Sequence, residues 1–188
     1  MTLRSRLPEL DDATMSAEQR RVLDDILSGP RGNLDGPFLA WVHSPQLADH
    51  AQRLGAFCRY HTSLPLRLTE LAILTTAAWW KSQAEWQIHA PIALKAGLSE
   101  SVVEALREGR QPTFERSDEV IVHRLASVLY QHRRVDQATY DRAVEAFGEE
   151  AVVELVGVLG YYALVAMTLN VFEVRRGDEP LPFVEPSL

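Results

Sequence analysis

Signals that begin and end helices recur along the whole chain, and nowhere do apolar and polar residues alternate long enough to form a β-strand. Ser16 and Gln19 have the spacing of a capping box at the start of one helix, and Gly29 and Pro30 end that helix. The same signals place helices at about residues 16–29, 45–62, 68–80, 82–96, 99–109, 117–131, 136–147 and 149–173, the last two separated by Gly148. The sequence therefore predicts an all-α fold of about seven to eight helices.

Size and charge restrict the class of protein. The 188 residues are enough for a single domain spanning 1–188, with an N-terminal arm and helix at 1–36 and an extended, proline-containing tail at 174–188. Lys and Arg number 19 against 26 Asp and Glu, and a net charge of −7 opposes binding to nucleic acid. With one cysteine, Cys58, neither an intramolecular disulfide nor a thiolate metal cluster can form. The N-terminus lacks the apolar run of a signal peptide, so we expect a cytoplasmic protein.

One segment resembles a membrane span. Residues 155–172 carry no charge over 18 residues, which reaches the lower limit of spanning length. Polar residues within the run, among them Thr168 and Asn170, and two glycines favour a buried central helix or a helix at a subunit interface. We therefore expect no membrane partner.

Four polar residues that suit acid/base chemistry lie between residues 70 and 89. Glu70 is a carboxylate on an otherwise apolar helix, where it is costly unless it is paired or exposed. Glu85 and His89 are four residues apart and share one face of the next helix, and Ser82 stands at the N-terminus of that helix. Tryptophans at positions 79, 80 and 86 surround this turn with aromatic surface. The pattern indicates a candidate acid/base site.

Each of these residues also has a structural interpretation. Glu85 has the position of the reciprocal carboxylate in a capping box. His89 can be a core histidine that is hydrogen-bonded to Glu85, and Glu70 can be the buried partner of Arg67 or Lys81. No further ligand cluster accompanies Glu85 and His89, so we expect neither a metal nor another cofactor.

The joint spacing of Glu70, Ser82, Glu85 and His89 resembles the core motif of the carboxymuconolactone decarboxylase and AhpD-like alkylhydroperoxidase superfamily. In its peroxidase branch the two middle positions are both cysteine. The segment AEWQIHAPIALKAGLSESVVEAL resembles the decarboxylase branch, and the resemblance is specific over about residues 66–108. It is looser through GYYALVAMTLNVFE near the C-terminus. The resemblance implies an AhpD-like helical domain that assembles as a homo-oligomer, commonly a trimer or hexamer.

In that motif Ser82 and Glu85 stand where the peroxidase cysteines would be, and Glu70 and His89 fall on the proton-relay positions. Cys58 lies outside the motif and cannot replace the cysteine pair. Without a peroxidatic thiolate and a resolving thiol, thiol peroxidase activity is excluded.

The resemblance implies a cofactor-free carboxy-lyase that acts on a small unsaturated lactone or carboxylic acid from the degradation of aromatic compounds. His89 would donate a proton to the dienolate, with Glu85 as its orienting partner, Glu70 as a second relay and Ser82 holding the lactone carbonyl. The residues expected to contact the substrate are Trp80, Trp86 and Tyr161. The cations nearest to the motif that could bind a substrate carboxylate are Arg59, Arg67 and Lys81.

Two alternatives stay open at this point. The same His/Glu pair can serve a lactone isomerase or hydrolase. The chain can also be a non-catalytic oligomeric binding protein in which Glu85 and His89 are structural.

Overall fold

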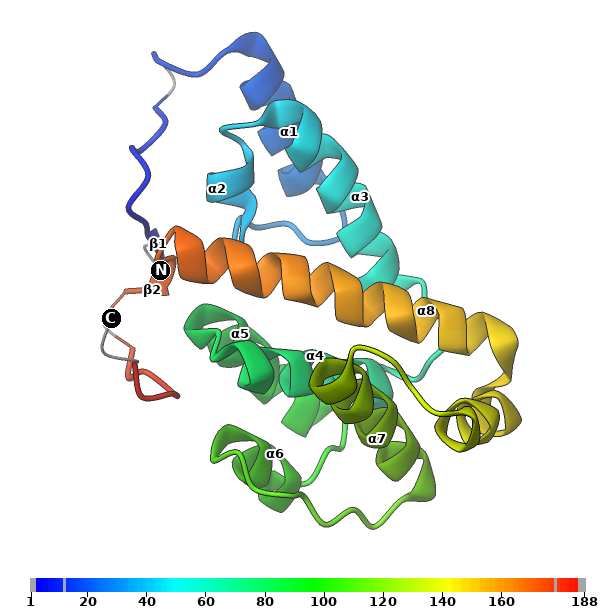
Figure 1. Ribbon diagram of the computed structural model, residues 1–188. Helices are drawn as coiled ribbons and strands as arrows, with labels where there is room; N and C mark the ends of the chain where they lie inside the picture. Colours follow the sequence, from blue (N-terminus) through cyan, green and yellow to red (C-terminus); the bar gives the residue numbers. More distant parts are fainter. Residues whose placement is uncertain (1–2, 12, 178, 186–188) are drawn as a thin grey trace.

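The computed structural model describes residues 3–11, 13–177 and 179–185, so the ends of the expected arm and tail (residues 1–2 and 186–188) lie outside the described residues. The helices of the described part are α1 (Ala17–Ser28), α2 (Phe38–Trp41), α3 (Pro45–Tyr60), α4 (Leu66–Trp80), α5 (Gln83–Lys95), α6 (Glu100–Arg107), α7 (Ser117–His132) and α8 (Gln137–Val171). Strands β1 (Leu3–Arg4) and β2 (Arg175–Arg176) form a two-residue antiparallel pair that joins the two ends of the chain (Figure 1). The prediction of an all-α fold is confirmed.

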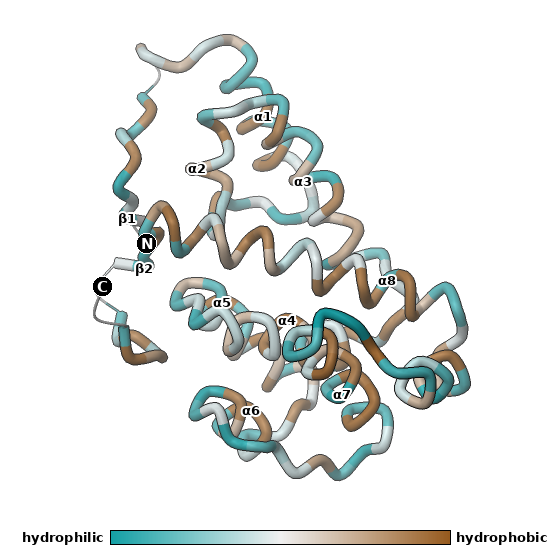
Figure 2. The backbone as a smooth tube through the Cα atoms, in the orientation of Figure 1, coloured by the Kyte–Doolittle hydropathy of each residue, from teal (hydrophilic) through white to brown (hydrophobic). Residues whose placement is uncertain are grey.

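Helix α8 crosses the middle of the molecule, with α1 to α3 on one side and α4 to α7 on the other (Figure 1). Figure 2 shows apolar residues recurring along its whole length. By length and composition α8 could cross a membrane, but 56% of its most apolar 18-residue window is buried inside the protein. It packs against α3, α4, α5 and α7, as is typical of the core helix of a soluble protein.

Helix α8, which contains nearly all of the uncharged segment 155–172, is broken at Gly148, where the sequence predicts the end of one helix and the start of the next. At Gly148 the backbone has φ 81° and ψ 164°, which is not helical, so two helical segments meet at a kink inside α8. Glycine adopts this positive φ without the steric cost of a Cβ. The kink lets the two segments of α8 run in different directions (Figure 1).

Helix α4 is the most buried element and positions the candidate site. Its residues from Arg67 to Ala77 are all buried. It ends at Lys81, which has a left-handed conformation (φ 50°), and the amide of Ser82 then donates to the carbonyl of Ala77 at 2.9 Å. This arrangement is a Schellman turn. It reverses the chain so that α5 packs back along α4.

The terminal segments pack on the same helices. Tail residue Phe183 exchanges two hydrogen bonds with the side-chain amide of Gln83 (2.8 and 2.9 Å), and its ring packs edge-on against Trp86. The carbonyl of Gln87, which has no helical donor because Pro91 lacks an N–H, accepts from Arg176 at 3.3 Å. The tail thus covers the outer face of α5.

Helix α2 was not predicted. It is a single turn that begins after Gly36 and Pro37 without a side-chain cap, so no start signal marks it in the sequence. Its Phe38 and Trp41 are nevertheless buried, and Trp41 donates its indole N–H to Thr168 of α8 at 2.9 Å. Tertiary packing, rather than local propensity, therefore stabilises this turn.

Candidate functional site

A buried histidine–carboxylate pair joins α4 to α5. His89 Nδ1 lies 2.8 Å from Oε2 of Glu70, and both side chains are almost fully buried. Nε2 of His89 has no hydrogen bond to any described residue. The carboxylate therefore orients the ring through one nitrogen and leaves the other for a water or a substrate.

The geometry corrects the expected partner of His89. Glu85 was expected to orient the imidazole because the two residues share one face of α5, but Glu70 of α4 makes that hydrogen bond. Residues four apart on a helix are neighbours, yet their side chains need not turn toward each other. The packing of α5 against α4 brings Glu70 to the ring instead.

Glu85 is the second unusual group. It is buried, and neither of its carboxyl oxygens has a hydrogen-bond partner among the described residues. Burial, and next the negative charge of Glu70, raise the pKa of Glu85 well above its usual range. Glu85 therefore keeps its proton to a higher pH than a free carboxyl group, and in that protonated form it can act as a hydrogen-bond donor.

The capping box predicted at the start of α5 is absent. Neither Ser82 Oγ nor Glu85 makes a capping hydrogen bond, and Ser82 Oγ is buried without a partner among the described side chains. The Ser82 amide, expected to hold a lactone carbonyl, is already bonded to Ala77. The Schellman turn thus occupies the Ser82 amide, which is one of the groups that a capping box would have used.

Glu85 and His89 line a small cavity of about 20 Å³, which has room for about one water molecule. Helix α5 supplies one wall and α8 another, with Tyr161 and Tyr162 among its residues. The remaining walls are formed by Arg59 of α3 and by residues 31 and 35–37 of the loop between α1 and α2. The loop segment comes from outside the motif.

The two tyrosines are held in place by close packing. The Tyr162 ring meets the His89 ring edge-on, with ring centres 5.0 Å apart. The Tyr161 ring fills the space in which Gly55 of α3 has no side chain, because a Cβ there would overlap its hydroxyl. Burial raises the pKa of both phenols, so both remain neutral hydroxyl groups.

Of the three residues expected to contact the substrate, one lines the cavity and two do not. Tyr161 lines the cavity, but Trp80 and Trp86 do not, since Trp86 packs against Phe183 and Trp80 lies near the end of α4. Trp80 carries a buried indole N–H with no partner in the described part of the chain. Neither tryptophan lines this cavity, so their contact with a substrate stays a prediction.

Of the three candidate cations, only Arg59 lines the cavity. Arg67 forms ion pairs with Asp118 at 2.7 Å and with Glu119 on α7. Lys81 lies over the Phe183 ring, 5.0 Å from its centre. Arg31, which the sequence analysis missed, lines the cavity as well, and its loop carries no motif that could have identified it.

Comparison with solved structures finds a protein of the same fold. A crystal structure of an alkylhydroperoxidase AhpD core, an uncharacterized peroxidase-related protein from Ralstonia eutropha JMP134, superposes with a TM-score of 0.73. The match covers 93% of each chain at 15% sequence identity. No protein-family model matches the sequence, and no curated protein matches it significantly. At this identity the likeness shows the fold alone, and that fold is AhpD-like.

Proposed function

We propose that the chain is a cofactor-independent lyase of the carboxymuconolactone decarboxylase type, acting on a small unsaturated lactone or carboxylic acid. One observation carries the proposal: a buried His89–Glu70 pair and a neutral Glu85 face the same small cavity. Protonation of a carbanion needs one group that gives a proton to carbon, and a second proton-bearing group can stabilise the enolate oxygen. The AhpD-like fold is compatible with the proposal but does not by itself define a reaction.

The chemistry follows from these positions. The bond between the ring and its carboxyl carbon breaks, carbon dioxide leaves, and the electron pair passes into the lactone as a dienolate. Glu85, carrying its proton, donates a hydrogen bond to the developing enolate oxygen, the role that Ser82 was expected to have. His89 gives the proton on Nε2 to carbon, and Glu70 orients the ring through Nδ1.

The thiol chemistry of peroxidases does not fit this site. Ser82 and Glu85 occupy the two positions of the cysteine pair. Cys58 is buried on α3, and burial raises the pKa of its thiol to about 11. A protonated, buried thiol is a poor nucleophile toward a peroxide. The name of the structural neighbour therefore describes a chemistry that these residues do not support.

The direct test is release of carbon dioxide from 4-carboxymuconolactone by the wild type, His89→Ala and His50→Ala. We expect the His89 variant to lose about 10²- to 10⁴-fold in rate, because it lacks the general acid. His50 is an exposed histidine on α3, and its variant should match the wild type. Wild-type release by the His89 variant would overturn the proposal, as would a folded wild type that converts no lactone or small unsaturated acid.

The cavity also supports a second candidate. A site with room for one water beside Nε2 of His89 suits hydrolysis of a lactone, with His89 as the base that activates the water. Mass spectrometry of the same reaction separates the two candidates. Hydrolysis adds one water to the substrate, whereas decarboxylation removes carbon dioxide.

Self-association belongs to the same proposal. The outer face of α8 exposes Val153, Val156 and Val171, and Gly157 and Gly160 on the same helix face open space. Uncharged surface with small residues allows close approach of a second copy. We expect a trimer or hexamer in solution, measured by analytical ultracentrifugation. A monomer at micromolar concentration would contradict this part.

A further inference from the structure

Arg31 and Arg59 are the two cations that line the cavity, and neither has an acidic partner among the described residues. The guanidinium of Arg31 lies over the Phe38 ring, 4.6 Å from its centre, and its Nη2 is buried without a hydrogen bond. Arg59 lies over the Tyr60 ring at 5.6 Å. Stacking satisfies the flat faces of a guanidinium but leaves its N–H donors unused.

Both arginines exert an electrostatic effect on the hydroxyl groups of Tyr161 and Tyr162. Each lowers the pKa of Tyr161 and of Tyr162 against the larger effect of burial, so each lies near both hydroxyl groups. The tyrosines line the cavity beside Glu85 and His89. Two unpaired guanidinium groups therefore face the region where the proposed proton transfer takes place.

No anion in the cavity wall balances this charge. Glu70 is engaged with His89, the carboxylate of Asp35 lies 3.7 Å from Arg176, and burial raises the pKa of Glu85 and so favours its neutral form. A partly buried guanidinium without a partner is costly, and a bound anion removes that cost. Planar guanidinium donors match the two oxygens of a carboxylate.

We propose that Arg31 and Arg59 together bind the carboxylate of a small organic acid and so determine the substrate class of this site. The inference rests on the proposed function, because it assigns the carboxylate to the same cavity in which His89 and Glu85 transfer protons. The acid is held by its carboxylate at the arginines, and its unsaturated carbon lies toward His89. The specificity of the site then comes from Arg31 and Arg59, which lie outside the motif.

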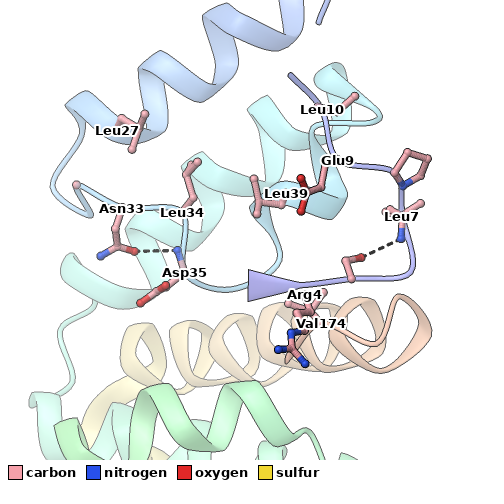
Figure 3. Close-up of a pocket in the computed structure, with 13 residues that line it drawn as sticks. Arg4, Leu7, Glu9, Leu10, Leu27, Asn33, Leu34, Asp35, Leu39 and Val174 are labelled. Atoms are coloured by element: carbon pink, nitrogen blue, oxygen red, sulfur yellow. Dashed lines mark hydrogen bonds between the residues drawn. The ribbon is translucent and has the colours of Figure 1, made fainter. Parts of the chain in front are cut away.

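A cavity of about 20 Å³ is far too small for an organic acid, so binding requires the wall at Arg31 to move. Its loop lies between this cavity and an open groove of about 1020 Å³, and Asp35 lines both. Figure 3 shows Asn33, Leu34 and Asp35 along one side of that groove, opposite residues of the N-terminal arm. Gly32 and Gly36 have φ values of 65° and 110° and bracket this stretch. In this proposal the loop carrying Arg31 is the part of the wall that moves, because it lies between the cavity and the groove.

The test measures binding without turnover. Isothermal calorimetry with 2-furoate, maleate and acetate supplies small carboxylates, and 2-furamide supplies the neutral counterpart of furoate. The proteins are wild type, Arg31→Gln, Arg59→Gln, and Arg53→Gln as the matched control, since Arg53 lies on α3, is exposed and pairs with Asp49. Arg31→Lys keeps the charge without the planar fork, and thermal melts confirm that each variant is folded.

We expect a carboxylate to bind the wild type and Arg53→Gln equally and 2-furamide not to bind. Each of Arg31→Gln and Arg59→Gln should weaken binding by about tenfold or more, with Arg31→Lys in between. Equal binding of furoate and furamide, unchanged binding by the folded glutamine variants, or no binding of any carboxylate would overturn the inference.

The two proposals fail in different ways. If carboxylates bind through the arginines but no substrate reacts, the proposed reaction is wrong and the binding site stands. If lactone turnover depends on His89 but is unchanged in both arginine variants, the reaction stands and this inference is wrong.

Discussion

Replacing Glu85 with glutamine should stabilise the protein in a way that grows with pH. Because burial raises the pKa of Glu85, the native state keeps the carboxyl proton at pH values where the unfolded chain, with a carboxyl pKa of 4.5, has lost it. The Glu85 carboxyl in its protonated form makes its full contribution to native stability below pH 4.5. This contribution is lost as the pH rises toward the native pKa of Glu85. Each pH unit in that window removes about 1.4 kcal/mol from the free energy of unfolding.

Glutamine has the same shape and does not titrate, so the variant is free of this loss. From pH 5 up to the native pKa of Glu85, the stability of Glu85→Gln relative to wild type should rise by up to about 1.4 kcal/mol for each pH unit, which corresponds to a few degrees in melting temperature for a domain of this size. Urea unfolding at half-unit steps of pH measures the difference. Glu150→Gln, an exposed change on α8, is the control and should show no such slope.

A flat difference between pH 5 and pH 7 would refute the reasoning, because it would mean that Glu85 is ionised in the native state. A difference of the opposite sign would indicate a cation beside the carboxylate. In either case Glu85 could not donate a hydrogen bond to an enolate oxygen. The amide of glutamine can still donate a hydrogen bond to an enolate oxygen, so Glu85→Gln tests the titration of Glu85 and not its role in the reaction.

Two further changes test the walls of the site. Gly55→Ala should destabilise the protein by about 1 to 3 kcal/mol in urea unfolding, because the new Cβ overlaps the Tyr161 hydroxyl and lies 3.0 Å from its Cε1. Glu70→Gln should lower the decarboxylation rate about as strongly as loss of His89 and move its pH profile, because an amide no longer fixes the charge and orientation of the ring; an unchanged profile would make Glu70 a structural residue only.

Most of the fold could be predicted because its signals are local. The capping box of Ser16 and Gln19 forms as expected, Ser99 and Asp136 cap the helices that follow them, and Gly148 breaks α8. Each of these features depends on a few neighbouring residues and the backbone that they share. Helix α2 depends on burial of Phe38 and Trp41 against distant elements, and no local rule contains that information.

The candidate site was predictable in its membership but not in its pairing. Spacing placed Glu70, Ser82, Glu85 and His89 together, yet it assigned Glu85 to His89, whereas the contact between α4 and α5 assigns Glu70. The choice between two carboxylates depends on how two helices cross, which is a tertiary property. The same limit explains the tryptophans: Trp86 packs against Phe183, almost a hundred residues further along the chain.

The candidate site combines residues on two buried helices with two arginines from outside the motif. The residues proposed to transfer protons lie on α4 and α5, whose buried faces hold the Glu70–His89 pair. Arg31 lies instead on a loop that separates the cavity from an open groove, and Arg59 lies on α3 outside the motif. Changes in residues 29–37 or in α3 can therefore alter the acid that binds without disturbing the proton transfer. Proteins that share the α4–α5 core but differ in these two segments should differ in substrate and agree in the chemistry at His89.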